Sequence, residues 1–121
     1  MSSKCVYLEG NMKLAVVGSR SLRNVAVDQY IEKTVEEIVS GGATGVDSCA
    51  AEYAKRRGLK LTEFLPQYDH YGRAAPIVRN REIVDYADEI LIFWDGKSKG
   101  TLSVIKYVQK IGKPYQIIHL E

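Results

Sequence analysis

The sequence predicts an α/β fold in which helices cover both faces of a parallel sheet. Short apolar runs alternate along the chain with longer segments of helical periodicity, and loops containing glycine or proline separate them. The 121 residues are 45% hydrophobic and 26% charged, a balance that is typical of a globular domain. We therefore expect a single domain over residues 1–121, with about five parallel strands in a three-layer α/β/α sandwich.

The first strands and the first helix are predicted from the spacing of their apolar residues. Residues 13–18 form an apolar run that ends in Gly-Ser-Arg, which is typical of a strand buried on both faces. Branched apolar residues at four-residue steps predict a helix within residues 25–35, and Asn24 can accept the free amide hydrogens of its first turn. Residues 37–40 are expected to form a short second strand.

Glycine bounds the second predicted helix on both sides. This helix is expected over residues 46–57, directly after a Gly-Gly-Ala-Thr-Gly segment, and Gly58 suits the left-handed position that follows a helix. Residues 59–65 are typical of a third strand, which stops at Pro66.

A polar, aromatic connection over residues 67–72 leads to the third predicted helix. This helix is expected over residues 76–86 because a proline can occupy its first turn without losing a hydrogen bond. We expect it to bury Ile77, Ile83 and Val84.

The last third of the chain contains the strongest strand pattern. Residues 89–94 are almost wholly apolar, and the polar segment 95–100 breaks the run. A helix is expected over residues 101–111, ending before a glycine and a proline, and residues 115–120 form the closing strand.

Composition excludes several classes of protein. No apolar run reaches the length of about 18 residues that a transmembrane helix needs, and residues 1–11 lack the apolar core of a signal peptide. We therefore expect a cytoplasmic protein without membrane contact. Within residues 1–11, the segment 5–8 is compatible with a short extra strand or with a loose leader.

The cysteines and the net charge do not indicate a metal site, a redox site or a nucleic-acid partner. Cys5 and Cys49 have no metal-site or redox spacing, and a net charge of +2 is too small to indicate nucleic-acid binding by itself.

Three polar, glycine-bearing loops predict a ligand site. They follow predicted strands, and the carboxyl ends of parallel strands meet at one edge of a sheet, where ligands bind. Each loop leads into a predicted helix, whose free N–H groups favour anions. Neither a G-x-G-x-x-G fingerprint nor a P-loop occurs. The predicted ligand-binding residues are Gly18, Ser19, Arg20, Gly41, Gly42, Ala43, Gly45, Asp47, Arg79, Asn80, Trp94, Asp95, Gly96, Ser98, Gly100 and Thr101.

Arg79 has two interpretations at this stage. It shares a helix face with Ile83, so its guanidinium can face the site and hold a phosphate through two hydrogen bonds. It can equally be an exposed residue that pairs with Glu82 or Asp85.

Four short blocks resemble the SLOG superfamily, which includes the DNA-processing protein A family and the lonely-guy phosphoribohydrolases. The blocks are residues 17–20, 40–47, 79–83 and 98–101. The compact length resembles the small stand-alone bacterial and phage members. The resemblance implies a Rossmann-like sheet, ordered 3-2-1-4-5, that binds nucleotides or their derivatives.

The last block departs from the phosphoribohydrolases, in which it resembles Pro-Gly-Gly-x-Gly-Thr-x-x-Glu and the Glu is catalytic. Here Val104 stands in place of that Glu, while Arg79 keeps the place of the family's arginine. Asp47 is the best remaining carboxylate, and we take Asp47 and Arg79 as the catalytic candidates. Asp95 is the next carboxylate after Asp47, and either can act on a glycosidic bond or contact a ribose hydroxyl. For Asp47, N-capping of its helix is an equally good explanation.

We expect a nucleotide-type ligand, a phosphorylated ribose compound, bound by a sensor, a carrier or a weak processing enzyme, with no cofactor assigned. The alternatives are an N-glycosidic phosphoribohydrolase and a protein that binds single-stranded DNA, in which Trp94 and Tyr68 or Tyr71 stack bases. Residues 68–86 contain more apolar and aromatic side chains than one helix face buries. We expect this segment to contribute to a homodimer, and tyrosines lining the ligand pocket are the competing explanation.

Overall fold

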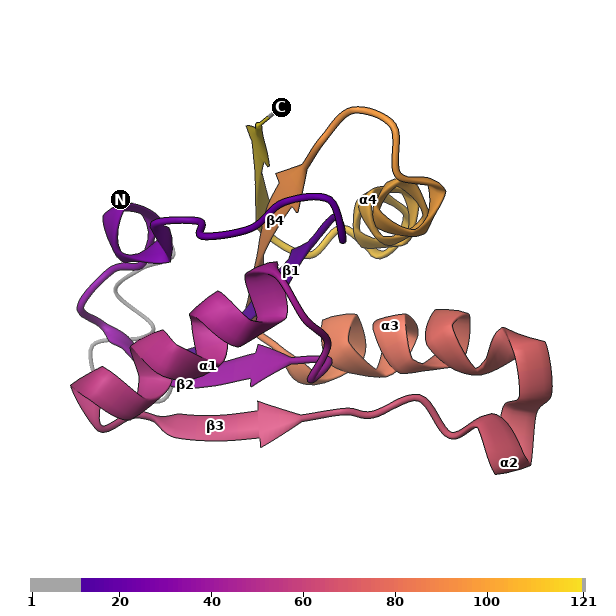
Figure 1. Cartoon of the computed structure of the whole chain (residues 1–121), viewed down its shortest axis with the longest axis horizontal. Helices are drawn as coiled ribbons and strands as arrows, with labels where there is room; N and C mark the ends of the chain where they lie inside the picture. Colours follow the sequence, from indigo (N-terminus) through magenta and orange to yellow (C-terminus); the bar gives the residue numbers. More distant parts are fainter. Residues whose placement is uncertain (1–11, 121) are drawn as a thin grey trace.

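The computed structural model describes residues 12–120 and contains a five-stranded parallel sheet ordered β3-β2-β1-β4-β5 (Figure 1). This confirms the predicted fold class and the strand order that the resemblance implied. The strands are β1 (Met12–Gly18), β2 (Val35–Ser40), β3 (Lys60–Glu63), β4 (Glu89–Trp94) and β5 (Tyr115–His119). The helices are η2 (Val27–Tyr30), α1 (Val46–Arg57), α2 (Tyr68–Tyr71), η3 (Gly72–Ala74), α3 (Ala75–Tyr86) and α4 (Lys99–Ile111).

The sheet has a hydrophobic core on each of its two faces, which gives the fold three layers, with the sheet in the middle. In β1, Leu14 and Val16 belong to the core that includes residues of η2 and α1, while Ala15 and Val17 belong to the core formed with α3 and α4. Successive residues of a strand point to opposite faces, so a continuous apolar run supplies both cores at once. The central strands β1 and β4 are therefore apolar along nearly their whole length.

The helix predicted within residues 25–35 is wrong. The structure has only the single 3-10 turn η2 there, and it begins after Ala26 without a side-chain cap. Asn24 adopts a positive φ of 54° instead of capping. Val35 pairs with Met12 at the start of β2, so the last residue of the expected helix is extended. The apolar spacing reflects burial correctly, but branched residues favour extended backbone over helix.

The chain between β3 and α3 extends beyond the sheet (Figure 1). The predicted polar connection contains the short helix α2 and the turn η3. Helix α3 then returns to the sheet, with Arg79 and Ile83 buried on one face. Ile77, predicted to be buried, is 48% exposed because a two-residue step turns about 200° around a helix, away from the buried Ala75.

No helix within residues 12–120 is long and apolar enough to cross a membrane. The expectation of a strand or a leader at residues 5–8 lies outside the described residues.

Candidate functional site

A cavity of about 410 Å³ lies where the loops after β1, β2 and β4 meet the start of α4 and one face of α3. This volume is in the range of about 300–1,000 Å³ that is usual for small-molecule sites. Of the predicted residues, the cavity is lined by Gly18, Arg20, Gly41, Ala43, Asp47, Arg79, Asn80, Asp95, Ser98, Gly100 and Thr101. The structure therefore brings together three loops whose sequences lie far apart in the chain.

Ser19 ties the first of these loops to the last. The side chain is buried, and its Oγ accepts a hydrogen bond from the backbone N–H of Asp95 at 3.1 Å. The same hydroxyl is 3.2 Å from the hydroxyl of Thr101 in the first turns of α4. Its backbone N–H also donates to the carbonyl of Phe93. Ser19 thus positions the wall of the cavity from behind, although it was predicted as a ligand-binding residue.

Asp95 organises the loop between β4 and α4. One carboxylate oxygen accepts the backbone N–H groups of Lys97 and Ser98, both at 2.8 Å, and the other accepts the hydroxyl of Ser21 at 2.6 Å. The hydrogen bond from Ser21, followed by those two amide bonds, holds the pKa of Asp95 well below its usual range. Asp95 therefore remains ionised, and it fixes the approach to α4.

The first turn of α4 presents backbone N–H groups at the cavity. Ser98 caps the helix by accepting the N–H of Thr101 at 3.2 Å. Gly100 has open space where a side chain would lie, the nearest heavy atom to an added Cβ being 4.0 Å away. No acidic residue occurs in this first turn, and the nearest carboxylate, that of Asp95, is bound to the N–H groups of Lys97 and Ser98 just before the helix.

The loop after β2 is different, because an acid of α1 occupies it. Asp47 lies in the first turn of α1 and accepts the N–H of Ala43 at 3.0 Å. Burial raises the pKa of Asp47 above its ordinary value, against the lowering effects of the Ala43 amide and of Arg79. A carboxylate here disfavours a phosphate and favours a hydroxyl or another donor as its neighbour.

Arg79 faces the cavity, so the alternative of an exposed pair with Glu82 or Asp85 is wrong. The side chain is buried, its Nη1 donates to the carbonyl of Gly41 at 2.9 Å, and its Nε donates to Asn80 Oδ1 at 2.8 Å. Burial lowers the pKa of Arg79, and the positive charge of Arg20 contributes to this lowering, while Asp47 opposes it. The two bonds use two of five N–H donors, so the guanidinium keeps donors for a ligand.

Gly18 and Gly41 allow close packing around the site. A Cβ added to Gly41 would lie 2.5 Å from Arg79 Nη1, and a Cβ at Gly18 would lie 2.5 Å from a methyl group of Val46. Glycine at these positions lets a guanidinium and a helix approach the strand ends closely.

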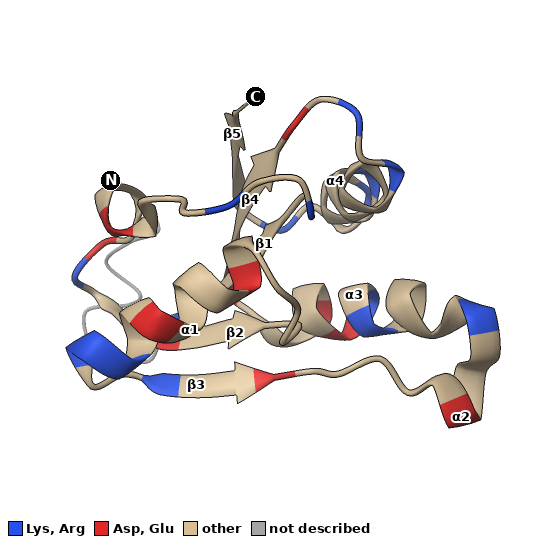
Figure 2. Ribbon diagram, in the orientation of Figure 1, with Lys and Arg blue, Asp and Glu red and all other residues tan. Residues whose placement is uncertain are grey.

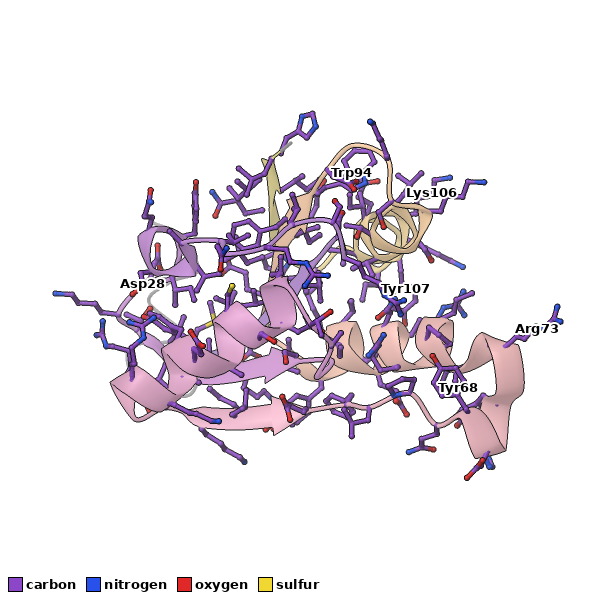
Figure 3. The ribbon with its side chains drawn as sticks, in the orientation of Figure 1. Asp28, Tyr68, Arg73, Trp94, Lys106 and Tyr107 are labelled. Atoms are coloured by element: carbon purple, nitrogen blue, oxygen red, sulfur yellow. The ribbon has the colours of Figure 1, made fainter. Side chains whose placement is uncertain are left out.

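Besides Ser19, four predicted residues do not line the cavity: Gly42, Gly45, Trp94 and Gly96. The three glycines have positive φ, so these positions are explained by loop conformation. The indole N–H of Trp94 donates to the carbonyl of Ser98 at 3.2 Å, which places the ring beside the loop that leads into α4 (Figure 3). Trp94 packs against the core on the α3 and α4 face.

Several lining residues were missed by the sequence reasoning: Val17, Ser21, Thr44, Pro76, Ile83 and Val104. Thr44 belongs to the glycine loop and Ser21 follows Arg20, so proximity to the motifs was an available signal. Ile83 and Val104 carried only the apolar periodicity of their helices, which does not distinguish a core position from a cavity wall.

Comparison with known proteins relates this geometry to a solved structure. No protein-family model matches the sequence, and no curated protein matches it. The X-ray structure of DNA processing protein A from Streptococcus pneumoniae is similar, with a TM-score of 0.73 and 22% sequence identity. The chain shares its fold. The match covers 95% of this chain and 52% of that protein, so this chain spans about half its length. At this identity the likeness shows the fold alone.

Proposed function

We propose that the cavity binds a nucleotide or a nucleotide derivative and that the protein acts as a sensor or carrier of this ligand. One observation carries the proposal: the N-terminus of α4 and two arginines face the same cavity as the partly buried acid Asp47. A phosphorylated ribose combines, within one small molecule, the anion and the hydroxyl groups that these two kinds of wall attract.

The phosphate is assigned to the wall formed by α4 and the arginines. Apart from the N–H of Thr101, which Ser98 caps, the N–H groups of the first turn of α4 are suited to an anion. An anion would also relieve the repulsion between Arg20 and Arg79. Lysines and arginines also lie on the loop before α4, in its first turn and on the loop after β1 (Figure 2). These cations would strengthen the attraction for a phosphate.

The ribose is assigned to the wall that contains Asp47. An acid at the edge of a parallel sheet can accept hydrogen bonds from ribose hydroxyls. The amide hydrogen bond from Ala43 reaches Oδ2 of Asp47, and a carboxylate has about four acceptor positions, so a ribose hydroxyl can be accepted in addition. We expect a ribonucleotide to bind more tightly than its 2′-deoxy analogue.

Efficient cleavage of the glycosidic bond is not expected. Val104 lines the cavity at the position where the resemblance to phosphoribohydrolases implies a catalytic Glu. Asp47 is the remaining candidate acid, with Arg79 as its partner for charge stabilisation. We expect negligible release of base from nucleotides, and turnover of about 1 per second or more would contradict this.

The second candidate is binding of single-stranded DNA, and the exposed Tyr68 favours it. This side chain is 55% exposed and projects from α2 beside the first turns of α3 (Figure 3). A base can stack on such a ring while an arginine holds the neighbouring phosphate. The shared fold with DNA processing protein A supports testing it.

A thermal-shift screen tests both candidates. Nucleoside 5′-monophosphates are compared with the matching nucleosides, and a ligand at 100 times its Kd should stabilise the protein by about 2.7 kcal/mol. Arg20→Ala should weaken binding, whereas Arg23→Ala, an exposed arginine that does not line the cavity, should not. If no phosphorylated ribose shifts the melting temperature and oligonucleotides bind with steep salt dependence, the DNA candidate replaces the first. Loss of oligonucleotide binding in Tyr68→Ala would then support stacking.

A further inference from the structure

The two edge strands of the sheet differ in charge. β3 begins with Lys60 and ends with Glu63, and Lys60 Nζ lies 3.9 Å from a carboxylate oxygen of Glu37 on β2. β5 has the sequence Tyr-Gln-Ile-Ile-His and contains no Lys, Arg, Asp or Glu. Charged side chains on an edge strand hinder its pairing with another chain. β3 has this protection and β5 does not.

The hydrogen bonds to β4 determine which backbone groups of β5 face outward. The N–H of Ile90 donates to the carbonyl of Pro114, and the N–H of Leu120 donates to the carbonyl of Trp94. Because consecutive residues of a strand direct their backbone groups to alternate sides, the even-numbered residues from 114 to 120 face β4. The N–H and C=O groups of Tyr115, Ile117 and His119 therefore face away from the sheet.

The same three residues carry apolar and aromatic side chains at the surface. Tyr115 is 40% exposed and Ile117 is 36% exposed, and His119 is exposed as well. The hydroxyl of Tyr115 accepts a hydrogen bond from Gln109 of α4 at 3.0 Å, which holds that ring at the edge. This edge thus combines regularly spaced backbone groups with side chains suited to a strand interface.

We propose that β5 pairs with β5 of a second copy of this chain, antiparallel, about a twofold axis at Ile117. In this register Ile117 lies opposite Ile117 of the second copy, and Tyr115 lies opposite His119. All three positions are then hydrogen-bonded pairs, because their N–H and C=O groups are the outward ones. Each pair exchanges two bonds, so the arrangement uses all of the outward groups of residues 115, 117 and 119.

The strand is suited to itself rather than to a charged partner segment. No like charges meet in the twofold register, and the apposed pairs are aliphatic with aliphatic and aromatic with aromatic, which stabilises strand pairs. The protected edge at β3 would end the joined sheet on both sides, so the assembly closes as a dimer instead of growing. No residue of β5 lines the ligand cavity, so the cavity remains accessible in the dimer.

The test compares two exposed isoleucines by light scattering coupled to gel filtration, over micromolar to millimolar concentrations. The wild type should approach twice its monomer mass of 13.6 kDa. Ile117→Lys, which places two lysines opposite each other, should remain at the monomer mass. Ile77→Lys, at the surface of α3, should dimerise like the wild type. A monomeric wild type overturns the proposal, as does a dimer that survives Ile117→Lys. Loss of the dimer in Ile77→Lys would favour the interface expected at residues 68–86. Circular dichroism confirms that each variant folds.

Cysteine cross-linking tests the register, in a background with Cys5 and Cys49 changed to Ser. Hydrogen-bonded antiparallel pairs have Cα atoms about 5.5 Å apart, within the range that a disulfide spans. Ile117→Cys should therefore give a dimer on a non-reducing gel. The control Gln116→Cys should not, since Ile118 lies opposite and the two cysteines are diagonal neighbours about 7–8 Å apart. Equal cross-linking of both variants overturns the register.

Discussion

Replacing Gly18 by alanine should destabilise the protein through a single steric contact. The added Cβ would lie 2.5 Å and 3.0 Å from the two methyl carbons of Val46 and 2.8 Å from its Cβ. Val46 is 1% exposed and starts α1, so it cannot rotate away into solvent. Overpacking of this kind costs about 1–3 kcal/mol. At roughly 4 °C per kcal/mol for a domain of this size, the melting temperature should fall by about 4–12 °C.

Gly100→Ala provides the matched control at the opposite wall of the cavity. An added Cβ there meets no atom closer than 4.0 Å, and alanine is favoured over glycine within a helix by up to about 1 kcal/mol. Gly100→Ala should therefore be as stable as the wild type or more so. Urea and thermal denaturation measure both variants. If Gly18→Ala is as stable as the wild type, α1 does not pack against the end of β1 as closely as described.

Three further predictions concern side-chain hydrogen bonds. Thr62→Val removes a 2.6 Å bond to Glu37 and should cost about 1 kcal/mol at neutral pH. Burial opposes ionisation of Glu37, but the hydrogen bonds from Thr62 and Tyr86 outweigh burial and lower the pKa of Glu37. The stability that ionised Glu37 contributes is therefore lost as the pH falls through its folded pKa. Urea denaturation at acid pH should accordingly show a smaller effect of Thr62→Val than at neutral pH. Asp47 has a raised pKa, so the folded state binds its proton more tightly than the unfolded state, and stability falls as the pH rises through that pKa. Asp47→Asn should abolish this fall of the melting temperature with pH and should not destabilise the protein at neutral pH. Asp95→Asn should loosen the loop before α4 and weaken nucleotide binding. Binding is measured by the fluorescence emission of Trp94, the single tryptophan, and an unchanged affinity would refute the positioning role of Asp95.

The sequence correctly predicted the elements whose residue pattern has a single physical explanation. Uninterrupted apolar runs identify β1 and β4, because strands buried on both faces need apolar residues at every position. The bounds of α1 agree with the prediction, with Gly58 in the left-handed conformation after its last turn. The loops that bring Gly18, Gly41 and Thr101 to one cavity follow from the rule that parallel strands end at one edge.

The predictions differ from the structure where two different structural roles give the same sequence pattern. Val27 and Ile31 are buried by a short turn and an extended segment, and their four-residue spacing does not distinguish this from a helix. Gly96 lies in the predicted loop and Trp94 ends the strand before it, but Gly96 has the positive φ that the loop needs and the indole of Trp94 binds the carbonyl of Ser98. Which side of a loop a residue faces depends on tertiary packing, which a local motif does not contain.

The contact between Ser19 and Thr101 joins positions 82 residues apart in the chain. The 82-residue separation is about two-thirds of the 121-residue chain, and both ends of that stretch must be in place before the wall that these two hydroxyls support can form. A ligand that occupies the cavity would hence select the completed fold over any partly assembled one. Two fragments of the chain, divided at the long connection after β3, would each lack about half of the cavity lining. A ligand that contacts both fragments would therefore promote their association.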